Sequence, residues 1–213
     1  MERQKQTKKI IIFDYDGTLY NGSVLTGWGD YVENFLNGYI GEKEAKKFIK
    51  RHGFESFNIV GQKLASALIK DFGTARVFYD HQDKNNYVLK ASDLKYVDSR
   101  ILKDLKKYAN IYIVSNSPVS HVVSNSKRNG FDISFADGIY SNQFNPEDVT
   151  KCDIYKIIQE KEKVLPENVF VVGDSEENDM KPAKRFGYNT LLVKDIKELE
   201  NVKEFINNPD KYK

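Results

Sequence analysis

The segment from Ile10 to Leu19 constrains the fold more than any other part of the sequence. It reads Ile-Ile-Ile-Phe-Asp-Tyr-Asp-Gly-Thr-Leu, so four apolar residues run directly into two carboxylates, a glycine and a threonine. An uninterrupted apolar run rich in β-branched residues is typical of a strand buried on both faces. The Asp-Gly step that follows predicts a turn. We therefore expect Asp14 and Asp16 at the C-terminal end of a buried strand, the edge at which open α/β sheets bind ligands.

Two carboxylates one residue apart oppose each other's ionisation unless a cation lies between them. Mg²⁺ suits this position because it prefers oxygen ligands. Asp and Gly also form turns without any metal, so a purely structural role for Asp14 and Asp16 is an alternative. A calcium-binding loop is excluded, since its sixth and twelfth positions require Gly and Glu, and here they hold Leu19 and Leu25.

The composition predicts a folded chain and limits its partners. A length of 213 residues suits one large domain, or a core domain with an insertion. The 33 basic and 31 acidic residues leave a net charge of +2, which gives no electrostatic case for a nucleic acid polymer as the partner. No apolar segment approaches the length of a membrane span. The single cysteine, Cys152, excludes an internal disulfide and favours a reducing, cytoplasmic location.

Residues from about 21 to 97 show helical patterns only. Between Trp28 and Tyr39, apolar side chains recur every three or four residues, which predicts an amphipathic helix. Further helices are expected at 42–51, at about 56–72, and around Val77. The sequence thus predicts an all-helical unit over residues 21–97, with residues 1–20 and 98–213 forming the core.

From Asp98 onward, predicted helices alternate with predicted strands. The strands are expected at 111–114, 133–135, 169–172 and 189–193. This alternation implies an α/β fold with a parallel sheet and right-handed crossovers. Polar side chains follow the first strand and two of the later ones: Asp14, Asp16, Ser115, Asn116, Asp174 and Asp179. Because the ends of parallel strands share one edge, these side chains can converge on one site.

This set of residues predicts phosphate chemistry. A Mg²⁺ ion held by Asp14, Asp16 and Asp174 would screen an incoming phosphate dianion from the carboxylates. Asp14 is the expected nucleophile, which would form an aspartyl phosphate. Asp16 is expected to protonate the leaving alkoxide and then to deprotonate the attacking water.

The phosphate itself needs further ligands. The Ser115 hydroxyl and backbone N–H groups at the start of the next helix can bind phosphate oxygens. Lys151 is expected to offset the phosphate charge, with Lys127 and Lys181 as alternatives. Taken singly, a Ser-Asn pair is usually a helix cap and a lysine is usually solvated. The ordered occurrence of all these residues at strand ends and helix starts favours the functional interpretation.

At this point the sequence resembles the haloacid dehalogenase (HAD) superfamily. The matching motifs are Asp14-Tyr15-Asp16-Gly17-Thr18, Ser115-Asn116, Lys151, and Gly173-Asp174 with Asp179. The resemblance implies a Rossmann-like core with a mobile helical cap inserted after the first motif. It also implies a Mg²⁺-dependent phosphatase that cleaves a small phosphate monoester, such as a nucleotide, phosphoglycolate or a sugar phosphate. Asp16, which the dehalogenases of the family lack, favours phosphate chemistry.

The resemblance assigns a role to each site residue. Asp14, Asp16, Ser115 and Lys151 are expected to be catalytic. Ser115, Asn116 and Lys151 are expected to bind the phosphate. The expected metal ligands are Asp14, Asp16, Asp174 and Asp179.

Some alternatives stay open at this stage. The fourth motif is one residue wider than its common form, so Glu177 and Asn178 are alternatives to Asp179. A phosphomutase of the same superfamily is the main alternative activity, and a phospho-accepting or non-catalytic binding protein is a more distant one. The specific substrate, the cap residues that select it, and the choice between monomer and dimer also stay open.

Overall fold

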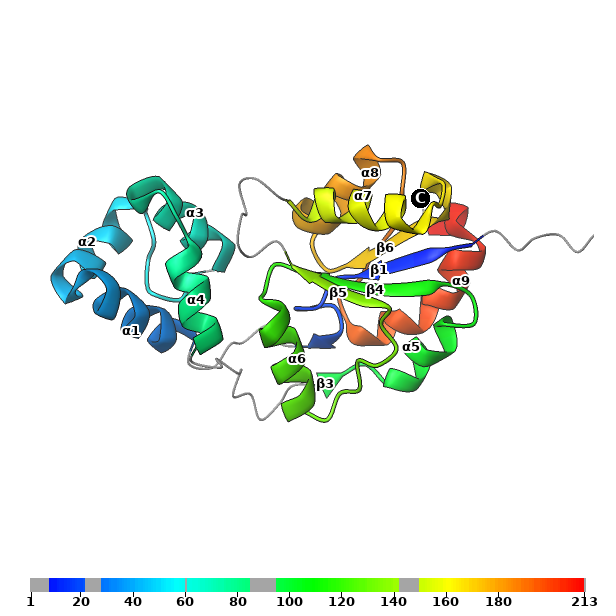
Figure 1. Ribbon diagram of the computed structural model, residues 1–213, viewed down its shortest axis with the longest axis horizontal. Helices are drawn as coiled ribbons and strands as arrows, with labels where there is room; N and C mark the ends of the chain where they lie inside the picture. Colours follow the sequence, from blue (N-terminus) through cyan, green and yellow to red (C-terminus); the bar gives the residue numbers. More distant parts are fainter. Residues whose placement is uncertain (1–7, 22–27, 60, 85–94, 142–149, 213) are drawn as a thin grey trace, which may run out of the picture.

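The computed structural model describes residues 8–21, 28–59, 61–84, 95–141 and 150–212 (Figure 1). Within these residues, a five-stranded parallel sheet forms the centre of the core, with strand order β5-β4-β1-β6-β7. The strands are β1 (Ile10–Phe13), β4 (Asn110–Ser115), β5 (Gly138–Ser141), β6 (Val169–Gly173) and β7 (Asn189–Leu192). Because β1 lies between β4 and β6, the C-terminal ends of these three strands are neighbours.

Helices cover both faces of the sheet. The core contains the α-helices α5 (Ser99–Leu105), α6 (Val119–Arg128), α7 (Lys151–Glu162), α8 (Lys181–Arg185) and α9 (Val202–Asn207). Short helical turns lie at Pro166–Asn168, Glu176–Met180, Ile196–Asn201 and Pro209–Tyr212. Side chains from α5, α6 and α9 pack on one face of the sheet, and side chains from α7 and α8 pack on the other.

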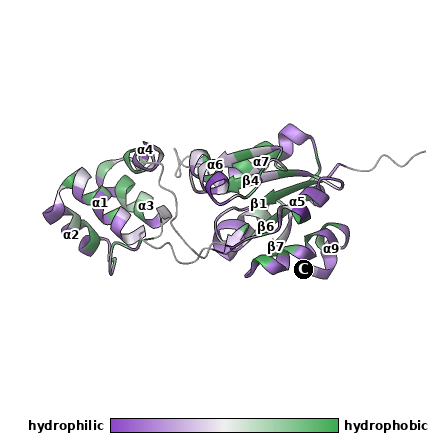
Figure 2. Ribbon diagram, turned by 90° about the horizontal axis from the view of Figure 1, so that it is seen from below, coloured by the Kyte–Doolittle hydropathy of each residue, from purple (hydrophilic) through white to green (hydrophobic). Residues whose placement is uncertain are grey.

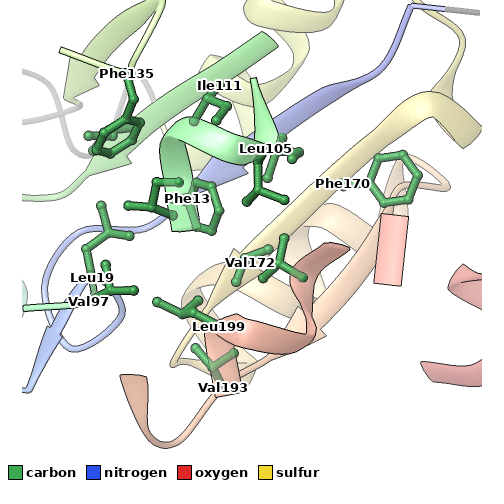
Figure 3. Packing of buried hydrophobic residues seen from close by; sticks show 14 of the residues in the cluster. Phe13, Leu19, Val97, Leu105, Ile111, Phe135, Phe170, Val172, Val193 and Leu199 are labelled. Atoms are coloured by element: carbon green, nitrogen blue, oxygen red, sulfur yellow. The ribbon is translucent and has the colours of Figure 1, made fainter. Parts of the chain in front are cut away.

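The uninterrupted apolar sequence of β1 follows from this arrangement. Successive side chains of a strand point to opposite faces. Ile11 and Phe13 belong to the cluster under α5, α6 and α9, part of which is shown in Figure 3. Ile10 and Ile12 belong to the cluster under α7 and α8. Since both faces are covered, each residue of β1 is fully buried, as the apolar run predicts.

The described residues of the cap form helices and the loops between them. It consists of α1 (Trp28–Ile40), α2 (Glu42–Arg51), α3 (Gly61–Phe72) and α4 (Arg76–Lys84). Its hydrophobic cluster is built from residues between Trp28 and Tyr79. Figure 2 shows these four helices grouped apart from the sheet, each with both hydrophobic and hydrophilic residues. The predicted fold class, a Rossmann-like α/β core with an inserted helical cap, is therefore confirmed.

Two strand predictions were wrong. The strand expected at 133–135 lies instead at β5 (Gly138–Ser141). Residues 133–135 belong to a turn, in which the Asp132 carboxylate accepts a hydrogen bond from the Ser134 backbone N–H at 2.9 Å. The region thought to be without strands also contributes to a short antiparallel pair, formed by β2 (Tyr20–Asn21) and β3 (Lys95–Tyr96). Two-residue strands are too short to leave a periodic pattern in a sequence.

Among the described residues, no helix combines the length and the apolar character that crossing a membrane requires.

Candidate active site

The central strands bring three of the predicted polar segments to one edge of the sheet. Asp14 directly follows β1, Ser115 ends β4, and Asp174 directly follows β6. The Asp14 backbone N–H donates to the Val172 carbonyl at 2.9 Å, which extends the pairing of β1 and β6 by one residue. Asp14 is thus fixed by the sheet itself, and not by a free loop.

Lys151 joins two buried acids. Its Nζ lies 2.5 Å from Asp14 Oδ1 and 2.7 Å from Asp179 Oδ1. Lys151 and Asp14 are each 5% exposed, and Asp179 is 1% exposed. Of the three lysines considered from the sequence, Lys127 and Lys181 are exposed to solvent. The structure therefore brings Lys151, and neither alternative, into the site.

A helix cap explains why Lys151 has a defined position. Thr150 caps α7: its Oγ1 accepts a hydrogen bond from the Asp153 backbone N–H at 3.3 Å. The Asp153 carboxylate in turn accepts one from the Thr150 backbone N–H at 2.7 Å. This reciprocal capping box satisfies backbone donors at the helix start. It fixes the first residue of α7, Lys151, against the end of β1.

Burial and neighbouring charges shift the ionisation of these groups. Burial raises the pKa of the Asp14 carboxyl to about 8; Lys151 opposes this rise, while Asp179 and Asp16 add to it. Burial alone would lower the pKa of the Lys151 ammonium, but Asp14 and Asp179 raise this pKa well above its ordinary value. Burial and the nearby Asp179 also raise the pKa of Asp174. One lysine thus faces three crowded acids, and the raised pKa values of Asp14 and Asp174 indicate that a further cation is needed to favour ionisation of all three.

Three of these acids can hold a cation together. Asp14, Asp174 and Asp179 each offer a carboxylate oxygen, and these oxygens lie within 4.8 Å of one another. A Cβ atom on Gly17 would lie 2.4 Å from Asp174 Oδ2, and a Cβ atom on Gly173 would lie 2.5 Å from Asp179 Oδ2. Only glycine leaves room for the carboxylates at these two places. Crowded, buried oxygens of this kind fit a hard divalent cation such as Mg²⁺.

A turn of π-helix accounts for the wider spacing of the fourth motif. In the segment Glu176–Met180, the Ser175 carbonyl accepts from the backbone N–H groups of both Asp179 and Met180. A π-helical turn accommodates one residue more than an α-helical turn. The alternatives Glu177 and Asn178 are exposed, whereas Asp179 is buried and accepts a hydrogen bond from the Ser175 N–H at 3.1 Å.

Asp16 has different neighbours from Asp14, and its carboxylate is not part of the three-acid group. Its Oδ2 accepts hydrogen bonds from Ser115 Oγ at 2.9 Å and from Ser117 Oγ at 2.8 Å. Its Oδ1 accepts one from the Tyr20 hydroxyl at 2.6 Å. The structure thus separates the carboxylate of Asp16 from the other three acids that were expected to hold the metal.

The sequence did not lead us to expect two of the hydrogen-bond donors to Asp16, Ser117 and Tyr20. Ser117 lies two residues after Ser115, and its backbone N–H also donates to Ser115 Oγ at 2.9 Å. The second serine of the segment Ser-Asn-Ser-Pro could have indicated that Ser117 also lies at the site. Tyr20 has no comparable signal, because it looks like one more apolar residue of the first motif. Asn116, an expected phosphate ligand, is half-buried in the bend between β4 and α6.

Comparisons with known proteins find the same fold. Similar solved structures include a HAD phosphatase from Thermococcus onnurineus, with 18% identity, a TM-score of 0.59, and coverage of 92% of this chain and 97% of that one. Another is a predicted phosphoglycolate phosphatase from Haemophilus somnus 129PT, with 20% identity, a TM-score of 0.56, and coverage of 89% and 86%. At these identities the likeness shows a shared fold. No curated protein matches the sequence.

The sequence itself matches the model of one protein family. The match is to the haloacid dehalogenase-like hydrolases, and it extends over residues 8–187, from just before β1 to just after α8. It therefore includes each strand end that contributes to the site. Because the match covers most of its length, the chain belongs to the haloacid dehalogenase-like hydrolase family.

Proposed function

We propose that this protein is a Mg²⁺-dependent phosphatase that cleaves a small phosphate monoester through an aspartyl phosphate on Asp14. The observation that carries the proposal is the environment of Asp14. It combines a buried carboxylate, a lysine 2.5 Å away and two further acids within reach of a shared cation. The presence of phosphatases among proteins of the same fold supports it.

Asp14, Asp174 and Asp179 would hold the metal ion. When bound, Mg²⁺ would favour the ionised form of these acids and polarise a phosphoryl oxygen of the substrate. Lys151 orients Asp14 and supplies a further positive charge near the phosphoryl group. Ser115, Asn116 and the N-terminal end of α6 bind the remaining phosphate oxygens.

Two steps complete the reaction. In the first, an Asp14 oxygen attacks phosphorus; a bond from Asp14 to phosphorus forms while the ester bond to the leaving oxygen breaks. Protonated Asp16 gives its proton to that leaving oxygen. In the second step, the Asp16 carboxylate takes a proton from water, and the resulting hydroxide attacks phosphorus. Inorganic phosphate is released, Asp14 returns as a carboxylate, and Asp16 is protonated again.

The cap favours a small substrate, because a helical domain beside the site can close over a small molecule more readily than over a polymer. Phosphoglycolate, nucleotides and sugar phosphates are the substrate classes that we propose to test. A phosphomutase would use the same residues, but it would pass the phosphoryl group from Asp14 to a sugar. It would therefore need a bisphosphate primer and would release little inorganic phosphate.

The test is phosphate release from a panel of phosphate monoesters, measured with Mg²⁺ and with EDTA. We expect metal-dependent release from at least one class, and no turnover by Asp14→Asn. A matched control is Asp132→Asn, because Asp132 is an exposed acid that pairs with Lys103 outside the site. The control should keep wild-type activity. Absence of release from the whole panel, or substantial turnover by a folded Asp14→Asn protein, would contradict the proposal.

A further inference from the structure

The aromatic ring of Tyr20 is held rigidly beside Asp16. Tyr20 begins β2 and pairs with Tyr96 of β3. Its side chain is 1% exposed. The ring packs edge-on against Tyr15, with ring centroids 5.2 Å apart, and contacts the Tyr96 ring at 5.1 Å. Because strand pairing and two rings fix it, the hydroxyl group has little freedom to move.

The Tyr20 hydroxyl and the serine hydroxyls donate to different oxygens of the Asp16 carboxylate. Tyr20 donates to Oδ1, whereas Ser115 and Ser117 donate to Oδ2. The serines belong to the segment after β4 that the proposed function assigns to phosphate binding, so an incoming phosphate offers them another acceptor. The Tyr20 ring packs between Tyr15 and Tyr96, and within the described part of the chain its hydroxyl has Asp16 as its one hydrogen-bond partner. Its bond to Oδ1 can therefore persist while the substrate enters.

We propose that Tyr20 is a positioning residue that holds the carboxyl group of Asp16 in the orientation required for proton transfer to the leaving oxygen. The inference rests on the proposed function, in which Asp16 is the general acid. The Tyr20 hydroxyl holds Oδ1, and this fixes the direction in which Oδ2 points. Oδ2 also faces the serines after β4, the side on which the phosphate is expected. General acid catalysis depends on this kind of hydrogen-bond geometry.

The test compares two leaving groups in two variants. Tyr20→Phe removes the hydroxyl that contacts Asp16. Tyr15→Phe is the matched control: it removes a hydroxyl from the same ring cluster, but that hydroxyl contacts Ser126 and Tyr96. The substrates are 4-nitrophenyl phosphate, whose leaving group needs no proton, and the alkyl phosphate that the wild type cleaves fastest. The value of kcat/KM reports the first chemical step, in which the leaving group departs.

For Tyr20→Phe we expect kcat/KM to fall about tenfold or more with the alkyl ester and less than about twofold with the aryl ester, because general acid catalysis contributes roughly 10²- to 10⁴-fold only where a proton is needed. Tyr15→Phe should affect both esters equally. An equal loss on both esters in Tyr20→Phe, no loss at all, or the same selectivity in Tyr15→Phe would overturn the inference.

A folding control and the activity of the wild type keep the outcomes distinct. Thermal unfolding shows whether each variant is folded at the assay temperature. If Tyr20→Phe is not, Tyr20→Met takes its place, because the flexible methionine side chain fills irregular core space without a hydroxyl. A wild-type protein that releases phosphate from neither ester would overturn the proposed function and this inference together. An active wild type without the leaving-group effect in the variant overturns only the role of Tyr20.

Discussion

The contact between Gly17 and Asp174 allows a direct test of the metal centre. Gly17 has a φ of 82°, a conformation that costs a residue with a Cβ atom about 1–2 kcal/mol. In Gly17→Ala, the new Cβ atom would also lie 2.4 Å from Asp174 Oδ2 and 2.9 Å from its Cγ. Such distances are too short for non-bonded atoms, so the Asp174 carboxylate must leave the position in which it can share a cation with Asp14 and Asp179.

Gly130 provides a matched control for the free-energy cost of placing a residue with a Cβ atom at a positive φ. It also has a positive φ, 65°, at the end of α6. A Cβ atom at this position meets no heavy atom within 4 Å. Gly130→Ala should therefore lose about 1 kcal/mol from the backbone conformation alone and leave the acids undisturbed. Any further loss in Gly17→Ala then reports the displacement of Asp174.

The assay is thermal unfolding in EDTA and in Mg²⁺. A cation that binds only the folded protein, present at a hundred times its Kd, stabilises it by about 2.7 kcal/mol. For a chain of this size, that corresponds to a rise in Tm of roughly 5–10 °C. We expect this rise in the wild type and in Gly130→Ala, and we expect it to be absent in Gly17→Ala, together with turnover. A wild-type response to Mg²⁺ in Gly17→Ala would refute the assignment of Asp174 as a metal ligand.

Further predictions concern the charges of the core. Lys151→Met leaves two buried acids without their cation, so urea unfolding in EDTA should show a loss of about 3–5 kcal/mol. Burial alone would raise the pKa of Glu162, but hydrogen bonds from Lys8 and from two β4 side chains lower it. This stabilisation is present above the unfolded pKa and is lost as the pH falls through the folded value. Glu162→Gln should therefore be about 1–2 kcal/mol less stable at pH 7, with the difference vanishing in acid; a constant difference would contradict this reasoning. Ser117→Ala should lower kcat/KM about two- to tenfold, since it removes one hydrogen bond to Asp16; unchanged kinetics would exclude a role for that contact.

The fold could be predicted largely because its elements leave strong patterns. A strand buried on both faces, such as β1, has no polar residue to interrupt it. The helix α2 follows Gly41, and its predicted range 42–51 coincides with the observed one. Strand β5 was misplaced because it is only half-buried, so its composition differs little from that of the turn before it. The pair β2 and β3 is held by contacts between residues about 75 positions apart in sequence, which no local pattern records.

The sequence predicted which residues belong to the candidate site better than it predicted the contacts between their side chains. The motifs predict that Asp14, Lys151 and Asp179 share one site, and in the structure Lys151 contacts both acids. The hydroxyls around Asp16 depend on how the turn after β1 approaches the loop after β4. That approach follows from the packing of the two strands and from the left-handed Gly17 between them. A sequence shows that a turn exists here, but it does not show which side chains the turn brings together.

The turn after β1 also explains how two nearly adjacent acids can take different roles. In a continuous strand, Asp14 and Asp16 would point to the same face and compete for one cation. Here the chain bends after Asp14: the Leu19 N–H donates to the Tyr15 carbonyl at 3.0 Å, and Asp16 turns toward the hydroxyls beside β4. A nucleophile must be ionised, which the neighbouring lysine and a bound cation favour, whereas a general acid must carry a proton at the start of the reaction. Because Lys151 and two further acids lie beside Asp14, whereas neutral hydroxyls surround Asp16, the bend gives the two acids the different environments that the proposed roles require.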